Sequence, residues 1–108
     1  MLSKTLGLIS LCRRAGKLKM GADPCREAVA SGQARLILYA DDFSAKTRAG
    51  LSREFSLAEN PPPQMEAGLS MFDFSQVCGK LTGVVAVLDD GFARGLRDLI
   101  RAENKEEY

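Results

Sequence analysis

The chain has 108 residues, 45% of them apolar, with 15 lysines and arginines against 14 aspartates and glutamates and no histidine. This length and composition predict one folded domain with its own core and argue against a disordered chain. The absence of histidine excludes Ser–His and Cys–His nucleophile pairs and imidazole metal ligands.

The cysteine pattern and the hydropathy of the chain predict the cellular compartment of the protein. The three cysteines are widely spaced and form no CxxC pair, a pattern typical of reduced thiols rather than of a disulfide framework or a zinc site. The apolar run near the N-terminus is followed at once by two arginines and has no small-residue cleavage motif, and no run reaches about 18 apolar residues. We therefore expect a cytoplasmic protein without a membrane partner.

The first half of the chain predicts a helix, a short strand, a second helix and a buried strand. Ser3 is expected to cap the first helix. Asp23 is expected to cap the second helix, with Pro24 at its first position and Gly32 ending it in the left-handed conformation. Residues 35–40 are continuously apolar after Arg35, which predicts a central strand.

The second half repeats the alternation of helices and strands. Ser44 is expected to cap a third helix, and a run of three prolines then predicts an extended connector before a short edge strand within residues 65–69. Asp73 with Gln76 predicts a capping box for a fourth helix that runs to about Leu81, with Phe72 and Val77 at its hydrophobic staple positions. Residues 83–88 predict a second central strand, followed by a final helix.

This order predicts an α/β fold in which a four-stranded sheet is covered by helices on both faces. Strands 35–40 and 83–88 are expected in the middle of the sheet. We assign residues 1–103 to a single domain and residues 104–108 to a polar tail.

Two acidic doublets, at residues 41–42 and 89–90, each follow a predicted central strand. Carboxylates gathered beyond strand ends could hold Mg²⁺, which is the one enzymatic hypothesis that the sequence offers. Helix capping explains the same aspartates and is the favoured interpretation. The sequence has no phosphate-binding loop motif and no metal-spaced cluster, so we expect neither an enzyme nor a cofactor.

A basic strip lies in the first 22 residues, which carry five cations and no acid. Lys17 and Lys19 alternate with apolar residues and are expected on one side of a short strand, close to Arg13 and Arg14. The strip suits contacts with phosphates, and an ordinary solvated basic face is the alternative.

Two glycine-containing segments are further candidates. Residues 21–24 precede a helix, whose free amides could bind an anion or RNA unless Asp23 occupies them as a cap. Gly79 and Gly83 could let the backbone approach a ligand, or could serve only a turn and helix–strand packing.

The segments RRAGKLKMGADPCREAVASGQARLILYADD (residues 13–42) and VCGKLTGVVAVLDDGFA (residues 77–93) resemble the ribosomal protein L7Ae family, most of all its small bacterial kink-turn RNA-binding members. The resemblance covers residues 3–101. It implies a three-layer α/β/α sandwich with a four-stranded mixed sheet, binding of structured RNA such as a kink-turn or ribosomal RNA, and association with the ribosome or translation proteins.

The family's RNA-binding helix begins Gly-x-Asn-Glu, with Lys three residues further on. This chain keeps Gly21 but has Asp23, Pro24 and Glu27 at the other positions. The three changes in charge are −1, +1 and −2, a net change of −2, which weakens attraction to phosphates. The second family contact, the loop beside the Leu-Gly-x-x-x-Gly motif, is matched by residues 78–83 with its spacing retained.

The first functional hypothesis is therefore a non-enzymatic RNA-binding accessory protein of the translation apparatus. The alternative is a protein-interaction module that keeps the fold without kink-turn specificity, and the charge of Glu27 favours it. The expected RNA-contacting residues are Arg14, Lys17, Lys19, Gly21, Asp23, Arg26, Ser75, Gln76, Gly79 and Lys80.

Overall fold

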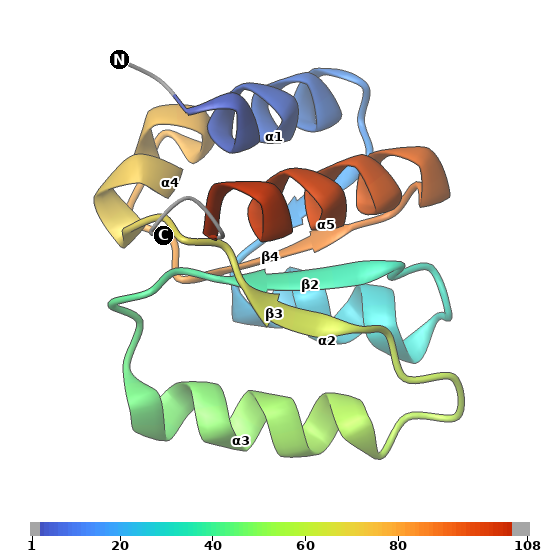
Figure 1. The fold of residues 1–108 in the computed structure, drawn as a ribbon. Coiled ribbons are helices and arrows are strands. Elements are labelled where there is room, and N and C mark those ends of the chain that lie inside the picture. Colours follow the sequence, from blue (N-terminus) through green and yellow to red (C-terminus); the bar gives the residue numbers. More distant parts are fainter. Residues whose placement is uncertain (1–2, 105–108) are drawn as a thin grey trace.

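The computed structural model describes residues 3–104 and consists of five helices that alternate with four strands (Figure 1). The predicted polar tail falls mainly on residues 105–108, which lie outside the described residues. The elements are α1 (Lys4–Arg14), β1 (Leu18–Met20), α2 (Ala22–Ala30), β2 (Leu36–Tyr39), α3 (Ala45–Ser56), β3 (Gln64–Glu66), α4 (Met71–Cys78), β4 (Val84–Val87) and α5 (Asp90–Asn104).

The four strands form one mixed sheet in the order β1-β4-β2-β3. β4 pairs antiparallel with both β1 and β2, and β3 runs parallel to β2. The predicted central strands are thus confirmed, and the short strand after the prolines lies at an edge. Edge strands tolerate the unpaired backbone groups that a proline-rich approach leaves.

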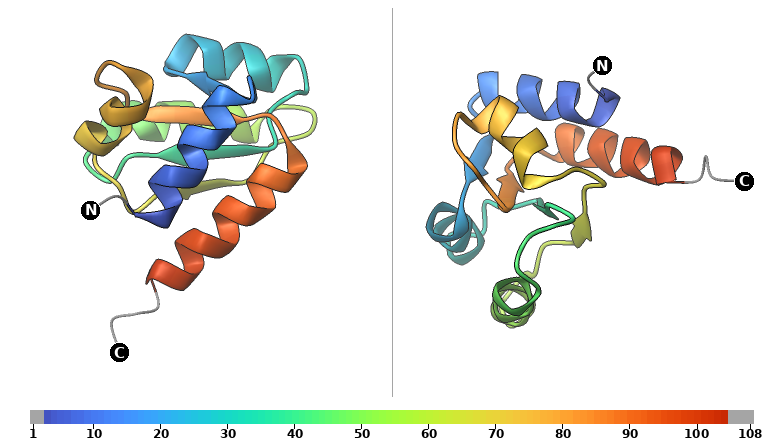
Figure 2. Two further views of the ribbon diagram at one scale, coloured as in Figure 1. Left: turned by 90° about the horizontal axis from the view of Figure 1, so that it is seen from above. Right: turned by 90° about the vertical axis from the view of Figure 1, so that its left-hand side faces the viewer.

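Helices cover both faces of the sheet (Figures 1 and 2). On one face, α1, α4 and α5 pack on alternate strand residues such as Leu38 and Val85. On the other face, α2 and α3 pack on the intervening residues, including Ile37 and Ala86. Both central strands are buried over their whole length, which explains why their sequences are continuously apolar. The predicted three-layer α/β/α sandwich is confirmed.

Two predicted helix caps are confirmed. The Ser3 hydroxyl accepts a hydrogen bond from the Leu6 amide at 3.0 Å, and the Ser44 hydroxyl accepts one from the Thr47 amide at 3.3 Å. Gly32 has a φ of 76°, as predicted for the residue that follows the end of α2.

Two other helix starts were predicted wrongly. α2 begins at Ala22 with Gly21 as its N-cap, so Asp23 lies inside the first turn, where its carboxylate makes no cap. α4 is capped by Ser70 rather than Asp73, because the reciprocal box forms between these two residues and leaves Gln76 outside it.

The end of α4 also differs from the prediction. The helix stops at Cys78, and Gly79 caps it with a φ of 81°, so Leu81 lies in the following loop. Phe72, which occupies an expected hydrophobic staple position, is 66% exposed. A staple requires an apolar contact across the first turn, and the earlier start of the helix directs Phe72 into solvent instead.

Within residues 3–104, no helix is long and apolar enough to cross a membrane. The same residues contain no cluster of three or more histidine, cysteine, aspartate or glutamate side chains that could hold a metal ion.

Candidate nucleic-acid interface

Four connecting segments meet at one end of the sheet, here called the sheet end and defined by residues 21–24, 40–42, 67–70 and 79–83. Backbone hydrogen bonds join them: the Gly21 amide donates to Val84, the Ala40 amide to Gly83 and the Asp41 amide to Leu69, at 2.8–2.9 Å. The right-hand view of Figure 2 faces this end, with α2 and α3 seen along their axes and α4 across the sheet from them.

The start of α2 has no side-chain cap. Gly21, with a φ of 97°, is the N-cap, and a β-carbon at this φ would be strained. Asp23 instead accepts a hydrogen bond from the Arg26 Nη1 at 2.8 Å. The same guanidinium donates through Nε to the Glu54 carboxylate at 3.0 Å, which ties α2 to α3. Among the described residues, the first-turn amides without a partner are those of Ala22 and Asp23, because Pro24 has no amide hydrogen and the Cys25 amide donates to the Gly21 carbonyl at 3.1 Å.

The loop from α4 to β4 lies across the sheet from this helix start. The buried Thr82 hydroxyl donates to the Lys80 carbonyl at 2.9 Å, and this contact shapes the turn while the Lys80 side chain stays exposed. Burial, and secondarily the nearby Cys78 thiol, raises the pKa of Cys25 to about 12. Cys25 belongs to the first turn of α2 and Cys78 ends α4, and both side chains are buried.

The other predicted residues of this region lie on α4. Gln76 is exposed, and the partly buried Ser75 donates its hydroxyl proton to the Phe72 carbonyl of its own helix. Gly79 is exposed at the helix end. Among the charged neighbours, Arg13 donates to the Val77 carbonyl at 2.7 Å, so this cation fastens α1 to α4.

Gly83 serves packing. A β-carbon at Gly83 would lie 2.0 Å from Cδ1 of Phe43, whose ring in turn stacks on Tyr39 with centroids 6.4 Å apart. Gly83 was expected either to let the backbone approach a ligand or to serve a turn and packing. The close contact with Phe43 explains this glycine by packing within the protein.

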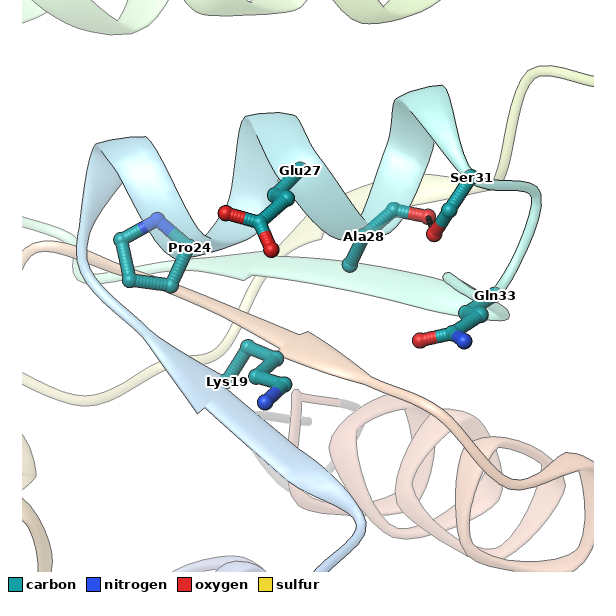
Figure 3. A pocket seen from close by; sticks show the side chains of 6 residues that line it. All are labelled: Lys19, Pro24, Glu27, Ala28, Ser31 and Gln33. Atoms are coloured by element: carbon teal, nitrogen blue, oxygen red, sulfur yellow. Dashed lines mark hydrogen bonds between the residues drawn. The ribbon is translucent and has the colours of Figure 1, made fainter.

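Strand β1 presents its lysines toward α2. Leu18 and Met20 pack into the core under α1 and α5, so the alternation of the strand directs Lys17 and Lys19 to the opposite side. Lys19 lines a groove of about 340 Å³ between β1 and α2 (Figure 3). Lys17 lines a neighbouring hollow at the other end of the strand, and Arg14 is exposed at the end of α1 just before it.

The predicted site residues therefore fall into two groups. One group lies at the sheet end and on the adjoining helix α4, and comprises Gly21, Asp23, Arg26, Ser75, Gln76, Gly79 and Lys80. Lys17 and Arg14 lie toward the opposite end of β1, roughly 13 Å from Gly21 at the rise of a strand. Lys19 lies between the groups.

The acidic doublets lie at opposite ends of the sheet, because β2 and β4 are antiparallel. Asp41 accepts from the Gly68 amide at 3.0 Å and Asp42 from the Met71 amide at 2.8 Å. Asp89 caps α5 by accepting from the Phe92 amide, and Asp90 pairs with Arg35. These backbone and ion-pair contacts match the capping interpretation, and the separation rules out a shared magnesium site.

Two features of the interface were missed from the sequence. Residues 67–70, which join β3 to α4, lie at the sheet end, and Arg35 shares a hollow with Lys17. No local pattern signals either one, because both depend on how distant strands pair. Phe72, by contrast, was predicted at a staple position, and the structure shows it exposed.

Comparison with known proteins supports the resemblance drawn from the motifs. No protein-family model matches the chain. The chain is 30% identical over 97 residues to "RNA-binding protein YlxQ" of Enterococcus faecium, covering 90% of this chain and 91% of that protein.

Two solved structures are similar to the whole fold. A protein of unknown function from Bacillus halodurans superposes with a TM-score of 0.80 at 29% identity, covering 92% of this chain and 98% of that one. A 15.5 kDa RNA-binding protein of Giardia lamblia superposes with a TM-score of 0.66 at 17% identity, covering 90% and 82%, and supports the fold alone. The near-complete alignment with YlxQ, an L7Ae-family protein, places the chain in the L7Ae family.

Proposed function

We infer that this protein binds structured RNA, without catalytic activity of its own, as an accessory protein of the translation apparatus. The observation that carries the proposal is the uncapped start of α2, which lies at the same end of the sheet as the loop bearing Lys80. The similarity to YlxQ, which is named as an RNA-binding protein, supports the same partner class.

The proposed contact uses the electrostatics of a helix N-terminus. Unpaired first-turn amides and the positive end of the helix dipole favour a phosphate at Gly21. The exposed ammonium groups of Lys19 and Lys80 flank this point from β1 and from the α4–β4 loop. Asp23 does not block the amides, because its carboxylate is held by Arg26.

The geometry favours a bent RNA over a straight one. α2 and α4 lie on opposite faces of the sheet, so the site spans the thickness of the protein at its end. A kinked RNA can touch both helix termini at once, with Ser75 and Gln76 offering polar groups beside Lys80. Pro24 and Glu27 weaken base reading and phosphate attraction relative to the family pattern, so we propose that shape contributes more than base contacts.

A second candidate function is a protein-interaction module on the same fold. Asp23 and Glu27 are both exposed on α2, and their charge suits a basic partner better than a phosphate. The two candidates differ in whether RNA binds at all.

The test is a titration of the full chain against a kink-turn RNA and a straight duplex of equal length, at two salt concentrations. Tighter binding of the kinked RNA supports the proposal. Equal, salt-sensitive binding to both limits the interface to the cations of β1 and excludes shape selection. If neither RNA binds, the proposal is wrong and the protein-interaction module takes its place.

A further inference from the structure

Two adjoining hollows form a groove beneath α2 along strand β1. Its first part, about 340 Å³, extends from Pro24 and Lys19 to Gln33 (Figure 3). Its second part, about 290 Å³, begins at Gln33 and continues to Lys17 and Arg35. Gln33 lines both parts, so the two hollows adjoin, one beginning at the start of α2 and the other lying toward the opposite end of the sheet.

The length of this β1–α2 groove follows from the helix above it. The nine residues of α2 rise by roughly 14 Å, which is the distance from the sheet end to the loop at Gln33. The hollow at Lys17 and Arg35 extends the path further. The groove is therefore long enough for a short extended strand, and too long for a single small anion.

Cations follow the groove at intervals. Lys19 and Lys17 are two residues apart on one side of β1, a spacing of roughly 7 Å. Arg35 comes next, on the far side of strand β4. The Leu88 amide donates to the Lys17 carbonyl at 2.9 Å, and the carbonyl of the adjacent Val87 accepts from the Arg35 amide at 2.7 Å.

The two lysines of the groove differ from Arg35 in their contacts within the protein. Among residues 3–104, neither Lys17 nor Lys19 takes part in an ion pair. Arg35 is held by Asp90 at 3.4 Å through Nε and donates from Nη1 to the Gly32 carbonyl at 3.3 Å, with its side chain still 47% exposed. Glu27 is the acidic residue of the lining, on the α2 wall opposite Lys19.

We propose that the β1–α2 groove holds a single-stranded extension of the bound RNA, an inference that rests on the proposed function. Lys19, Lys17 and Arg35 contact successive phosphates of this extension. The strand enters at the start of α2, where the structured part of the RNA binds, and leaves at Arg35. The neutral polar side chains of Ser31 and Gln33 face the sugars or bases along the way.

The structure favours an RNA strand over an acidic peptide. A peptide that adds to the edge of a sheet binds through its main chain, and the edge strand β1 offers three residues, of which Leu18 is 7% exposed. A phosphate chain needs only side-chain cations, and Lys19, Lys17 and Arg35 line the groove. No aromatic side chain lines the groove, so we expect phosphate contacts, which carry no sequence information, rather than base stacking.

The experiment compares a blunt kink-turn RNA with the same RNA carrying a single-stranded oligouridine extension, by fluorescence anisotropy at several salt concentrations. The extension is expected to tighten binding by the wild-type protein roughly tenfold and to steepen the salt dependence. Arg35→Gln should remove about 0.7 from the slope of log K against log salt for the extended RNA and leave blunt RNA nearly unaffected. Lys17→Gln should weaken binding of the extended RNA more than binding of the blunt RNA.

Arg53→Gln is the matched control, since Arg53 is an exposed arginine on α3 that does not line the groove. Thermal unfolding verifies that each variant is folded, and Lys17→Gln keeps the test valid if the loss of the Arg35 contacts unfolds that variant. A photo-crosslinking uridine in the extension should attach to the segment containing Gln33.

Three results would overturn the inference. The first is equal affinity of the wild-type protein for blunt and extended RNA, which leaves the proposed function standing. The second is an unchanged extension effect in both groove variants. The third is saturable, Arg35-dependent binding of a poly-glutamate peptide without any effect of the extension, which would assign the groove to an acidic peptide. Binding of neither RNA rejects the proposed function together with the inference.

Discussion

The sheet end and the β1–α2 groove differ in whether their charged side chains are already paired within the protein. At the sheet end most charges are already engaged: Arg26 by Asp23 and Glu54, Arg13 by a carbonyl, and the doublet at residues 41–42 by backbone amides. Along the groove the two lysines point to solvent, and among residues 3–104 neither makes an ion pair.

The difference separates residues that build the interface from residues that are available to a ligand. The engaged charges fix the relative positions of four loops and two helix termini, which is what a shape-selective site requires. The lysines of β1 keep their charge for an incoming phosphate. Substitutions at the sheet end should therefore change stability first, and substitutions along β1 should change affinity first.

The largest stability effect is expected from Gly83→Ala. The new β-carbon would overlap the Phe43 ring, whose position is fixed by stacking on Tyr39. Overpacking of this kind costs about 1–3 kcal/mol in the free energy of unfolding, measured by urea denaturation.

Gly50→Ala is the matched control, because nothing lies within 4 Å of the added β-carbon in the middle of α3. It should stabilise the protein by about 0.5–1 kcal/mol through helix propensity. Combining Gly83→Ala with Phe43→Ala should recover part of the loss caused by the clash. Equal effects of the two glycine substitutions would show that the loops at the sheet end are not tightly packed.

Alkaline pH should lower the free energy of unfolding, because two buried groups near the sheet end, Cys25 and Tyr39, resist ionisation. Burial raises the pKa of Cys25 from 9.0 to about 12, and burial also raises the pKa of Tyr39 to about 12. A group with a raised folded pKa stabilises fully below its unfolded pKa and loses that contribution as the pH rises through the folded value. The free energy of unfolding should therefore fall between pH 9 and 12, and Cys25→Ala should make the fall shallower. A parallel decline in wild type and variant would contradict the assignment.

A smaller effect is expected from Arg26→Gln. Its ion pairs with Asp23 and Glu54 are exposed, and such pairs stabilise by about 0–1 kcal/mol. Loss of Arg26 alone frees the Asp23 carboxylate beside the first turn of α2 and should weaken RNA binding, whereas the paired variant Asp23→Asn, Arg26→Gln removes both charges and should stay within about threefold of wild type, as measured by anisotropy. A tenfold loss in the paired variant would place Arg26 in direct contact with RNA and erase the distinction between the two regions.

The sequence predicted those parts of the fold that depend on local patterns. Ser3 and Ser44 were identified as caps because each precedes a helical pattern without a competitor. The start of α4 was misplaced because Ser70 and Asp73 are both good caps, and only the reciprocal hydrogen bonds between them decide the position. Asp23 was misjudged for a similar reason, since Gly21 can begin the helix two residues earlier.

The site depends on strand pairing, which local patterns do not encode. The antiparallel pairing of β2 and β4 separates the two acidic doublets and brings Arg35 beside Lys17. Lys17 and Lys19 could be placed on one side of a strand from alternation alone. That they line a groove under α2 follows only from the packing of that helix against the sheet.

The most direct measurement is the affinity of the Lys17→Glu, Lys19→Glu double variant for a kink-turn RNA, compared with the Asp23→Asn, Arg26→Gln variant and wild type at two salt concentrations. We expect the lysine variant, with unchanged thermal stability, to bind at least tenfold more weakly and with a shallower salt dependence, whereas the Asp23→Asn, Arg26→Gln variant remains close to wild type. Unchanged affinity in the lysine variant would contradict the central claim that free cations of β1 meet the RNA.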